Sequence, residues 1–142
     1  MKGVLPTATV KRRVQNKKRL DEEGPMKNAV VNLQGHKGQF FEVLQETERT
    51  QTAVMTIAPG RDGGPEETHA GDQVVYVIEG EALVTIEGTP HHARPGACAV
   101  IPAGARHHVK NPGAHPLFCL SVFAPPASVF STPTLRLAKL GM

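Results

Sequence analysis

The sequence is poor in aromatic residues and contains no long apolar run. It has no Trp, one Tyr and five Phe among 142 residues, so it offers few rings for stacking on a large aromatic ligand. No stretch approaches the ~20 apolar residues of a membrane-spanning helix, and no apolar segment follows the basic charges in the first 20 residues. We therefore expect a protein without a membrane segment or signal peptide, located in the cytoplasm.

Cysteine is also scarce. Cys98 and Cys119 are the two cysteines of the chain. They could form one disulfide, but two thiols are also common in cytosolic proteins as small buried hydrophobic side chains. We favour the second interpretation.

The charge is distributed unevenly along the chain. Nine of the sixteen Lys and Arg residues lie at or before Lys37, against three acidic residues there, which gives this segment a net charge of +6. The remaining residues have a net charge of −3. We expect a basic N-terminal arm at 1–27, a folded domain at 28–124 and a proline-containing C-terminal segment at 125–142. The arm lacks aromatic residues and any groove-reading motif, and it is too short for a helix-turn-helix domain, so nucleic-acid binding is not expected.

From about Asn28 onward the sequence has a β pattern. Short apolar or alternating stretches are separated by Gly, Pro, Asp and Asn, and no helical period of useful length competes with them. The predicted strands are 29–33, 39–44, 51–57, 73–78, 82–86, 91–94, 97–101, 107–110 and 117–123. Two alternating runs flank Glu79-Gly80-Glu81, which predicts a hairpin there. Nine short strands indicate an all-β barrel or sandwich.

Two motifs give the chain a family resemblance. The stretch ETHAGDQVVYVIEG, from Glu67 to Gly80, is similar to the first cupin motif, and GACAVIPAGARHHVKN, from Gly96 to Asn111, matches the spacing of the second. The resemblance covers about 50–124 and implies a cupin fold, a double-stranded β-helix of jelly-roll type. In this family the first motif supplies two histidines and a glutamate, and the second supplies one histidine.

The resemblance implies a metal site at Glu67, His69, Gln73 and His107. Glu67 stands where the family has its first histidine, and Gln73 stands where it has the glutamate. Positions 67, 69 and 73 share parity, so in one unbulged strand their side chains would point to the same face. Gln73 could bind the ion directly or contact a metal-bound water, and Glu66 competes with Glu67.

His107 must come from a different strand. The turn Pro102-Ala103-Gly104 would place it at the start of a strand, with the adjacent His108 facing the opposite way. Four other histidines are interpreted as surface or strand-edge residues, although one that lines the pocket could act as general acid or base: His91, His92, His108 and His115. His36 is expected to lie outside the site.

Two histidines with one carboxylate resemble the ligand set that suits Fe(II), and Mn, Ni, Co and Zn remain open. We expect one divalent transition metal and an enzyme for a small oxygenated molecule, either an oxygenase or a Lewis-acid lyase or isomerase. Val75 and Val77 would form an apolar pocket floor beside Gln73. The alternative is a non-catalytic cupin that senses a small ligand or has lost its metal. Because cupins commonly pair through their sheets, we also expect a homodimer.

Overall fold

The structure is a computed structural model that describes residues 28–127. The chain divides into two compact units, Met1–Val31 and Asn32–Met142, and every helix and strand given below belongs to the second. The basic arm predicted at 1–27 and most of the C-terminal segment lie outside the described residues. Within the described part, no helix is long and apolar enough to cross a membrane.

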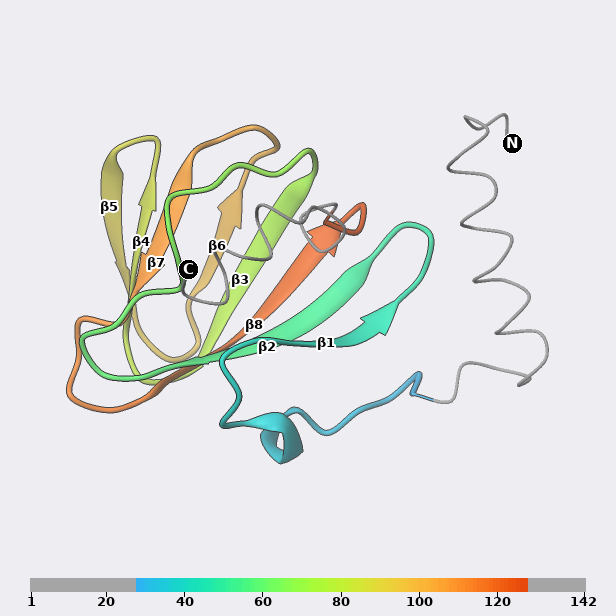
Figure 1. The fold of residues 1–142 in the computed structure, drawn as a ribbon, viewed down its shortest axis with the longest axis horizontal. Helices are drawn as coiled ribbons and strands as arrows, with labels where there is room; N and C mark the ends of the chain where they lie inside the picture. Colours follow the sequence, from blue (N-terminus) through green and yellow to red (C-terminus); the bar gives the residue numbers. More distant parts are fainter. Residues whose placement is uncertain (1–27, 128–142) are drawn as a thin grey trace. The chain divides into compact units, whose positions relative to one another are not determined.

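The described chain is almost entirely β, which confirms the predicted fold class. A four-residue 3-10 helix, Leu33–His36, precedes eight strands (Figure 1). The strands are β1 (Glu42–Glu46), β2 (Gln51–Ile57), β3 (Asp72–Glu79), β4 (Ala82–Ile86), β5 (Thr89–Ala93), β6 (Cys98–Ile101), β7 (His107–Lys110) and β8 (Leu117–Ala124).

The strands form two antiparallel sheets. One has five strands in the order β1-β2-β8-β3-β6, and the other has three in the order β5-β4-β7. Two isolated bridges, Asp62↔Lys110 and Glu67↔His107, connect the segment between β2 and β3 to β7. This segment therefore runs beside the smaller sheet before the chain enters β3 in the larger one.

The core lies between the sheets, and alternation along each strand explains how it forms. In β3, Gln73, Val75 and Val77 are at most 7% exposed, whereas Tyr76 is 41% exposed. The buried cluster draws on both sheets, with Ile57, Val75, Val77, Ile101, Leu117 and Cys119 from the larger and Ala82, Val84 and Ala93 from the smaller. Burying one apolar face of each sheet is the main stabilising contribution available to such a fold.

The hairpin predicted at Glu79-Gly80-Glu81 is wrong. β3 pairs with β6 and β8, whereas β4 pairs with β5 and β7, so the chain changes sheets at Gly80. Gly80 has φ +84°, and a Cβ there would lie 2.4 Å from the Pro116 carbonyl oxygen. The tight two-residue hairpin connects β4 to β5 instead, where Glu87 and Gly88 both have positive φ, as a type I′ turn requires.

The first predicted strand, at 29–33, is also wrong. Residues 28–30 form a turn and bend, and the 3-10 helix begins at Leu33. Val30 is 91% exposed. The Asn32 side chain accepts a hydrogen bond from the Gln34 backbone N–H, which favours a turn over a strand.

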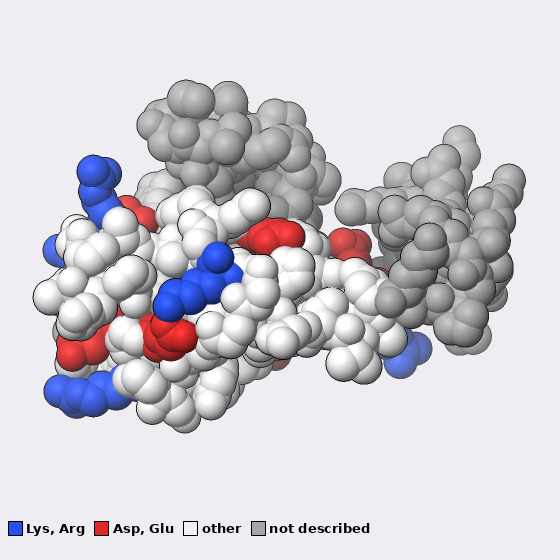
Figure 2. Space-filling model, turned by 90° about the horizontal axis from the view of Figure 1, so that it is seen from below, with Lys and Arg blue, Asp and Glu red and all other residues white. Residues whose placement is uncertain are grey.

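Charged side chains are scattered over the visible surface. On the face drawn in Figure 2, Lys and Arg stand singly among Asp and Glu, and they form no continuous basic patch there. Lys37 and Gln34 donate hydrogen bonds to the Glu79 carboxylate, and the Lys37 bond is the main reason that the pKa of Glu79 is lowered. This contact joins the segment around the 3-10 helix to the end of β3.

Candidate metal centre

The bridge between Glu67 and His107 positions the first two candidate ligands. The Glu67 N–H donates to the His107 carbonyl oxygen, and the His107 N–H donates to that of Glu67, both at 2.9 Å. Residues directly opposite each other in an antiparallel pair send their side chains to the same face. The Glu67 carboxylate and the His107 ring are therefore brought together in the barrel interior, and both residues are buried.

His69, two residues after Glu67, reaches the same place. Its carbonyl oxygen accepts a hydrogen bond from the Gly104 N–H at 2.8 Å, so the two family-like motifs are joined through their backbones. Its ring Nε2 lies 3.7 Å from Glu67 Oε1, and the side chain is 6% exposed. The His69 and His107 ring centroids are 4.9 Å apart, and the Phe123 ring makes a T-shaped contact with His69 at a centroid distance of 5.3 Å.

The three side chains form a group whose chemistry and spacing suit a metal ion. One ligand atom from each of Glu67, His69 and His107 lies within 4.8 Å of the other two. Two atoms each about 2.1 Å from a common ion lie at most about 4.2 Å apart, so closing this group on an ion requires movements of less than about 1 Å. Imidazole nitrogen and carboxylate oxygen are ordinary ligands for divalent transition metals.

His107 has the ring tautomer that ligation needs. Its Nδ1 lies 3.1 Å from the Ala105 carbonyl oxygen. A carbonyl oxygen can only accept, so Nδ1 carries the proton in this contact. The lone pair is then on Nε2, and the same contact fixes the direction of the ring.

Gln73 belongs to the five-stranded sheet. The expectation that it shares one strand with Glu67 and His69 is therefore wrong. Glu67 and His69 precede β3 and lie beside β7 and its preceding turn, whereas Gln73 is in β3 between β8 and β6. The three residues therefore do not share one strand. They still line one pocket, because the chain passes from the smaller to the larger sheet between Glu67 and Gln73.

The Gln73 amide is held at one end. Its Nε2 donates to Ser121 Oγ at 3.2 Å, and its Oε1 is buried and accepts no hydrogen bond from any residue in 28–127. A buried carbonyl oxygen without a donor costs about 1–3 kcal/mol. A cation or a ligand N–H or O–H group in the pocket would offset this cost.

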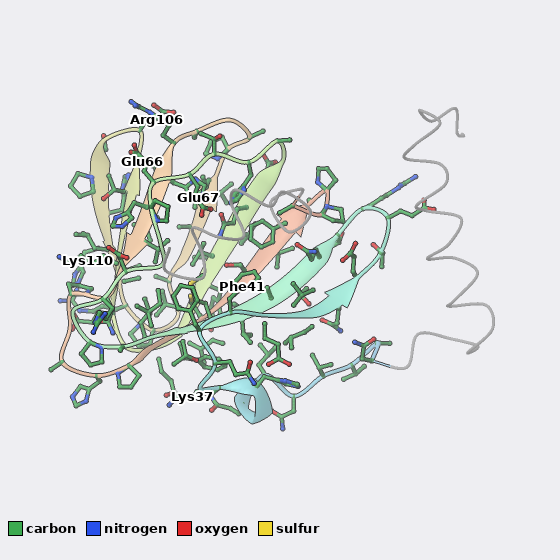
Figure 3. All side chains as sticks on the ribbon, viewed as in Figure 1. Lys37, Phe41, Glu66, Glu67, Arg106 and Lys110 are labelled. Carbon is green, nitrogen blue, oxygen red and sulfur yellow. The ribbon has the colours of Figure 1, made fainter. Side chains whose placement is uncertain are left out.

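About 470 Å³ of space not filled by protein atoms, part of it open solvent, adjoins these residues. Its polar side is formed by the candidate ligands, and its apolar walls include Phe41, Met55, Val75, Val109 and Phe123. Figure 3 shows Glu67 and Phe41 directed toward the space between the sheets, with Lys37, Arg106 and Lys110 at the periphery. Glu66, the competitor of Glu67, is exposed, whereas Glu67 is 7% exposed.

The other histidines lie outside this group. Three have a ring nitrogen 3.1–3.3 Å from a carboxylate oxygen: His36 beside Glu42, His92 beside Glu81 and His108 beside Asp62. His91 and His115 are exposed. His108 also lines the pocket, so it is the histidine that meets the sequence-based condition for a possible acid or base.

Sequence reasoning did not identify the β8 side of the pocket. Cys119, Ser121 and Phe123 line it from alternate positions of that strand. Ser121 could have been found as the single polar residue on the buried face of an otherwise apolar strand. Cys98 and Cys119 are both free, and burial raises the pKa of the Cys119 thiol to about 12, so at neutral pH it remains a protonated thiol.

Comparisons with known proteins agree with this architecture. The family described as "Cupin domain" matches residues 53–123. An uncharacterised Bacillus subtilis protein, YrkC, is 30% identical over 122 residues, which cover 80% of this chain and 65% of YrkC. The Escherichia coli HTH-type transcriptional regulator PuuR is 29% identical over 83 residues, covering 56% of this chain and 45% of PuuR. The chain thus spans less than two thirds of either relative.

Among solved structures, BH2720 from Bacillus halodurans superimposes with a TM-score of 0.64 and 31% identity. The match covers 70% of this chain and 83% of that protein. The double-stranded β-helix expected from the two sequence motifs is therefore confirmed.

Proposed function

Because this chain belongs to the cupin superfamily, we propose that it is a metal-dependent enzyme acting on a small oxygenated organic molecule. Glu67, His69 and His107 would hold one divalent metal, with the Gln73 carbonyl oxygen as a fourth donor. The observation that carries this proposal is the group of three buried side chains whose ligand atoms lie within 4.8 Å of one another.

The environment of these residues supports a role beyond structure. A structural ion site is usually closed by four protein ligands, whereas here the three strong ligands lie at the wall of an open pocket. When bound, the ion would polarise a substrate oxygen or activate dioxygen. The protein's own residues would hold the substrate against the ligand group, with Phe41, Met55 and Phe123 packing on its apolar part.

Metal content tests the proposal directly. We expect wild-type protein to retain close to one equivalent of metal after purification and desalting, measured by inductively coupled plasma mass spectrometry, and His107→Ala to lose it. His108→Ala is the matched control, because it removes the adjacent imidazole, which pairs with Asp62. Equal metal loss in both variants, or no metal in wild type after loading, would overturn the assignment.

Oxygen consumption distinguishes the two reaction classes that this ligand group could support. An oxygenase and a Lewis-acid lyase or isomerase both need the ligand group, and they differ in whether oxygen is consumed. We expect turnover of small diketones or phenols by anaerobically iron-loaded protein, monitored with an oxygen electrode and by product chromatography, and its loss in His69→Ala. Product formation without oxygen uptake would favour a lyase or isomerase.

A non-catalytic sensor is the second candidate, and the similarity to PuuR favours it. PuuR is an HTH-type transcriptional regulator, so a segment similar to this chain is found in a regulatory protein. A sensor would bind a small ligand without converting it. A salt-sensitive shift of duplex DNA that disappears when residues 1–27 are deleted would support this candidate over the enzyme.

We also propose that the protein is a homodimer that pairs through the outer face of the five-stranded sheet. Val74, Tyr76, Val100, Leu120 and Val122 meet there in two cross-strand rows. Val100 is 57% exposed and Tyr76 41%. Covering these apolar side chains would stabilise an assembly, and β6 is an edge strand of the described sheet.

A further inference from the structure

Ser121 forms one half of a buried hydroxyl–amide pair at the pocket wall. Its Oγ accepts the hydrogen bond from Gln73 Nε2, and the two residues are 4% and 7% exposed. In the register of the larger sheet Ser121 lies opposite Val75 in β3 and Ala53 in β2. Gln73, Val75 and Ser121 all line the pocket, so the pair is directed into it.

We propose that Ser121 is a positioning residue: it holds the Gln73 amide by its nitrogen and so directs the carbonyl oxygen toward the Glu67, His69 and His107 group. This inference rests on the proposed function, because it assigns a role toward the metal. It adds a residue that neither family-like motif contains.

The physical basis is the asymmetry of a primary amide. The oxygen can donate a lone pair to a cation, whereas the NH₂ group cannot because its lone pair is delocalised into the carbonyl, so the two amide orientations have opposite effects at a metal site. Gln has three rotatable side-chain bonds, and fixing them on metal binding costs entropy. A hydrogen bond already formed at Nε2 reduces that cost and leaves Oε1, which accepts no hydrogen bond from the described residues, facing the pocket.

The chain offers a matched control in the same sheet. Thr52 in β2 donates from Oγ1 to the Gln45 Oε1 at 2.8 Å, which is also a hydroxyl–glutamine pair. Thr52 lies opposite Val122, the neighbour of Ser121, so its side chain is on the other face of the sheet. Neither Gln45 nor Thr52 lines the pocket.

The experiment measures Co²⁺ affinity and the visible Co²⁺ spectrum of the full-length protein. Removing a residue that orients a ligand typically lowers metal affinity about 10–100-fold, so we expect Ser121→Ala to bind Co²⁺ at least about tenfold more weakly and with an altered spectrum. Thr52→Val, which also removes one hydroxyl, should leave both unchanged. Ser121→Thr keeps the hydroxyl and should restore most of the affinity, which separates positioning from a folding defect.

A double-mutant cycle decides between positioning and a general packing effect. If Ser121 acts through Gln73, Ser121→Ala should cause no further loss in a Gln73→Ala background. An equal loss in both backgrounds, or no loss in the wild-type background, overturns the role of Ser121 while the metal site stands. If wild-type protein binds no Co²⁺, both this inference and the proposed function fail.

Discussion

The amide of Gln73 determines how much charge the proposed donor group carries. Glu67 is the carboxylate in the described ligand group, so with Gln73 neutral and both histidines neutral, a divalent ion would leave a net charge of +1. A monoanionic ligand would then neutralise the site. This balance should govern which small molecules the pocket favours, because charges in a buried site are weakly screened.

Gln73→Glu tests that charge balance. A second carboxylate should strengthen Co²⁺ binding by about tenfold or more through added attraction, and it should weaken binding of azide to the Co²⁺-loaded protein by cancelling the net positive charge. Calorimetry measures the first effect and a spectroscopic azide titration the second. Gln45→Glu, outside the pocket, serves as the control. An azide affinity equal to that of wild type would contradict the charge argument.

The two thiols should differ sharply in reactivity. Cys98 is exposed in β6, whereas Cys119 is buried in β8 and burial raises its pKa to about 12. The thiolate is the reactive form, so below pH 12 Cys119 stays protonated as well as inaccessible. We expect an aromatic disulfide reagent at pH 8 to label one thiol per native chain and two in guanidinium chloride, measured on dissociated monomers because Cys98 lies opposite Tyr76 on the proposed dimer face. Rapid labelling of both thiols in native protein would contradict the buried position of Cys119.

Sequence spacing selected the residues of the candidate site but did not predict which strands carry them. Glu67, His69 and His107 were selected by the two motifs, and the structure brings their side chains together. The expectation that Glu67 and Gln73 share a strand failed, because parity describes one strand and not a chain that changes sheets. Ser121 was missed because a hydrogen bond between two sheet strands leaves no local sequence signal.

At the scale of elements, the buried Asn111 connects the end of β2 to the segment between β7 and β8. Its side chain donates to the carbonyl oxygens of Ile57 and His115 and accepts from the Gly113 N–H, at 2.8–2.9 Å. The residue is fully buried. Asn111 therefore fixes the end of β2 against the turn that leads from β7 to β8.

Asn111→Ala should be strongly destabilising. It removes three hydrogen bonds and leaves buried carbonyl groups without donors, for an expected loss of about 2–4 kcal/mol in the free energy of unfolding. Urea unfolding followed by circular dichroism measures the loss. Asn32→Ala is the control, because it also removes an Asn side-chain bond, to the Gln34 N–H, but at an exposed position; its cost should be below about 1 kcal/mol. Similar losses in both variants would contradict the role assigned to Asn111.

Strand positions followed from sequence more reliably than strand partners. The predicted ranges 51–57, 82–86 and 107–110 coincide with β2, β4 and β7, because alternation is a local property of the chain. Pairing depends on contacts between distant segments, so the turn at Gly80 could be located but not assigned to a hairpin or a sheet crossing. Apolar residues at 29–33 suggested a strand, but 28–30 form a turn and bend and Leu33 begins the 3-10 helix.

At the scale of the whole molecule, the apolar outer face of the five-stranded sheet predicts self-association. Val100 on β6 and Tyr76 on β3 are the large apolar side chains exposed in the two cross-strand rows that define this face. A lysine introduced in the centre of such a contact would lose its hydration in the dimer without gaining a charged partner. This costs several kcal/mol at each of the two symmetry-related positions. Val100→Lys should therefore shift a dimer to monomer.

Light scattering coupled to size exclusion measures this shift at fixed protein concentration. Val43→Lys is the matched control, because Val43 is 38% exposed on β1 at the opposite edge of the same sheet, outside the two rows. We expect wild type and Val43→Lys to run as dimers and Val100→Lys as a monomer with an unchanged circular dichroism spectrum. A dimer that survives Val100→Lys must use a different surface, and a monomeric wild type would exclude the assembly. Because the ligand group lies between the sheets of one chain, monomeric Val100→Lys should still bind Co²⁺.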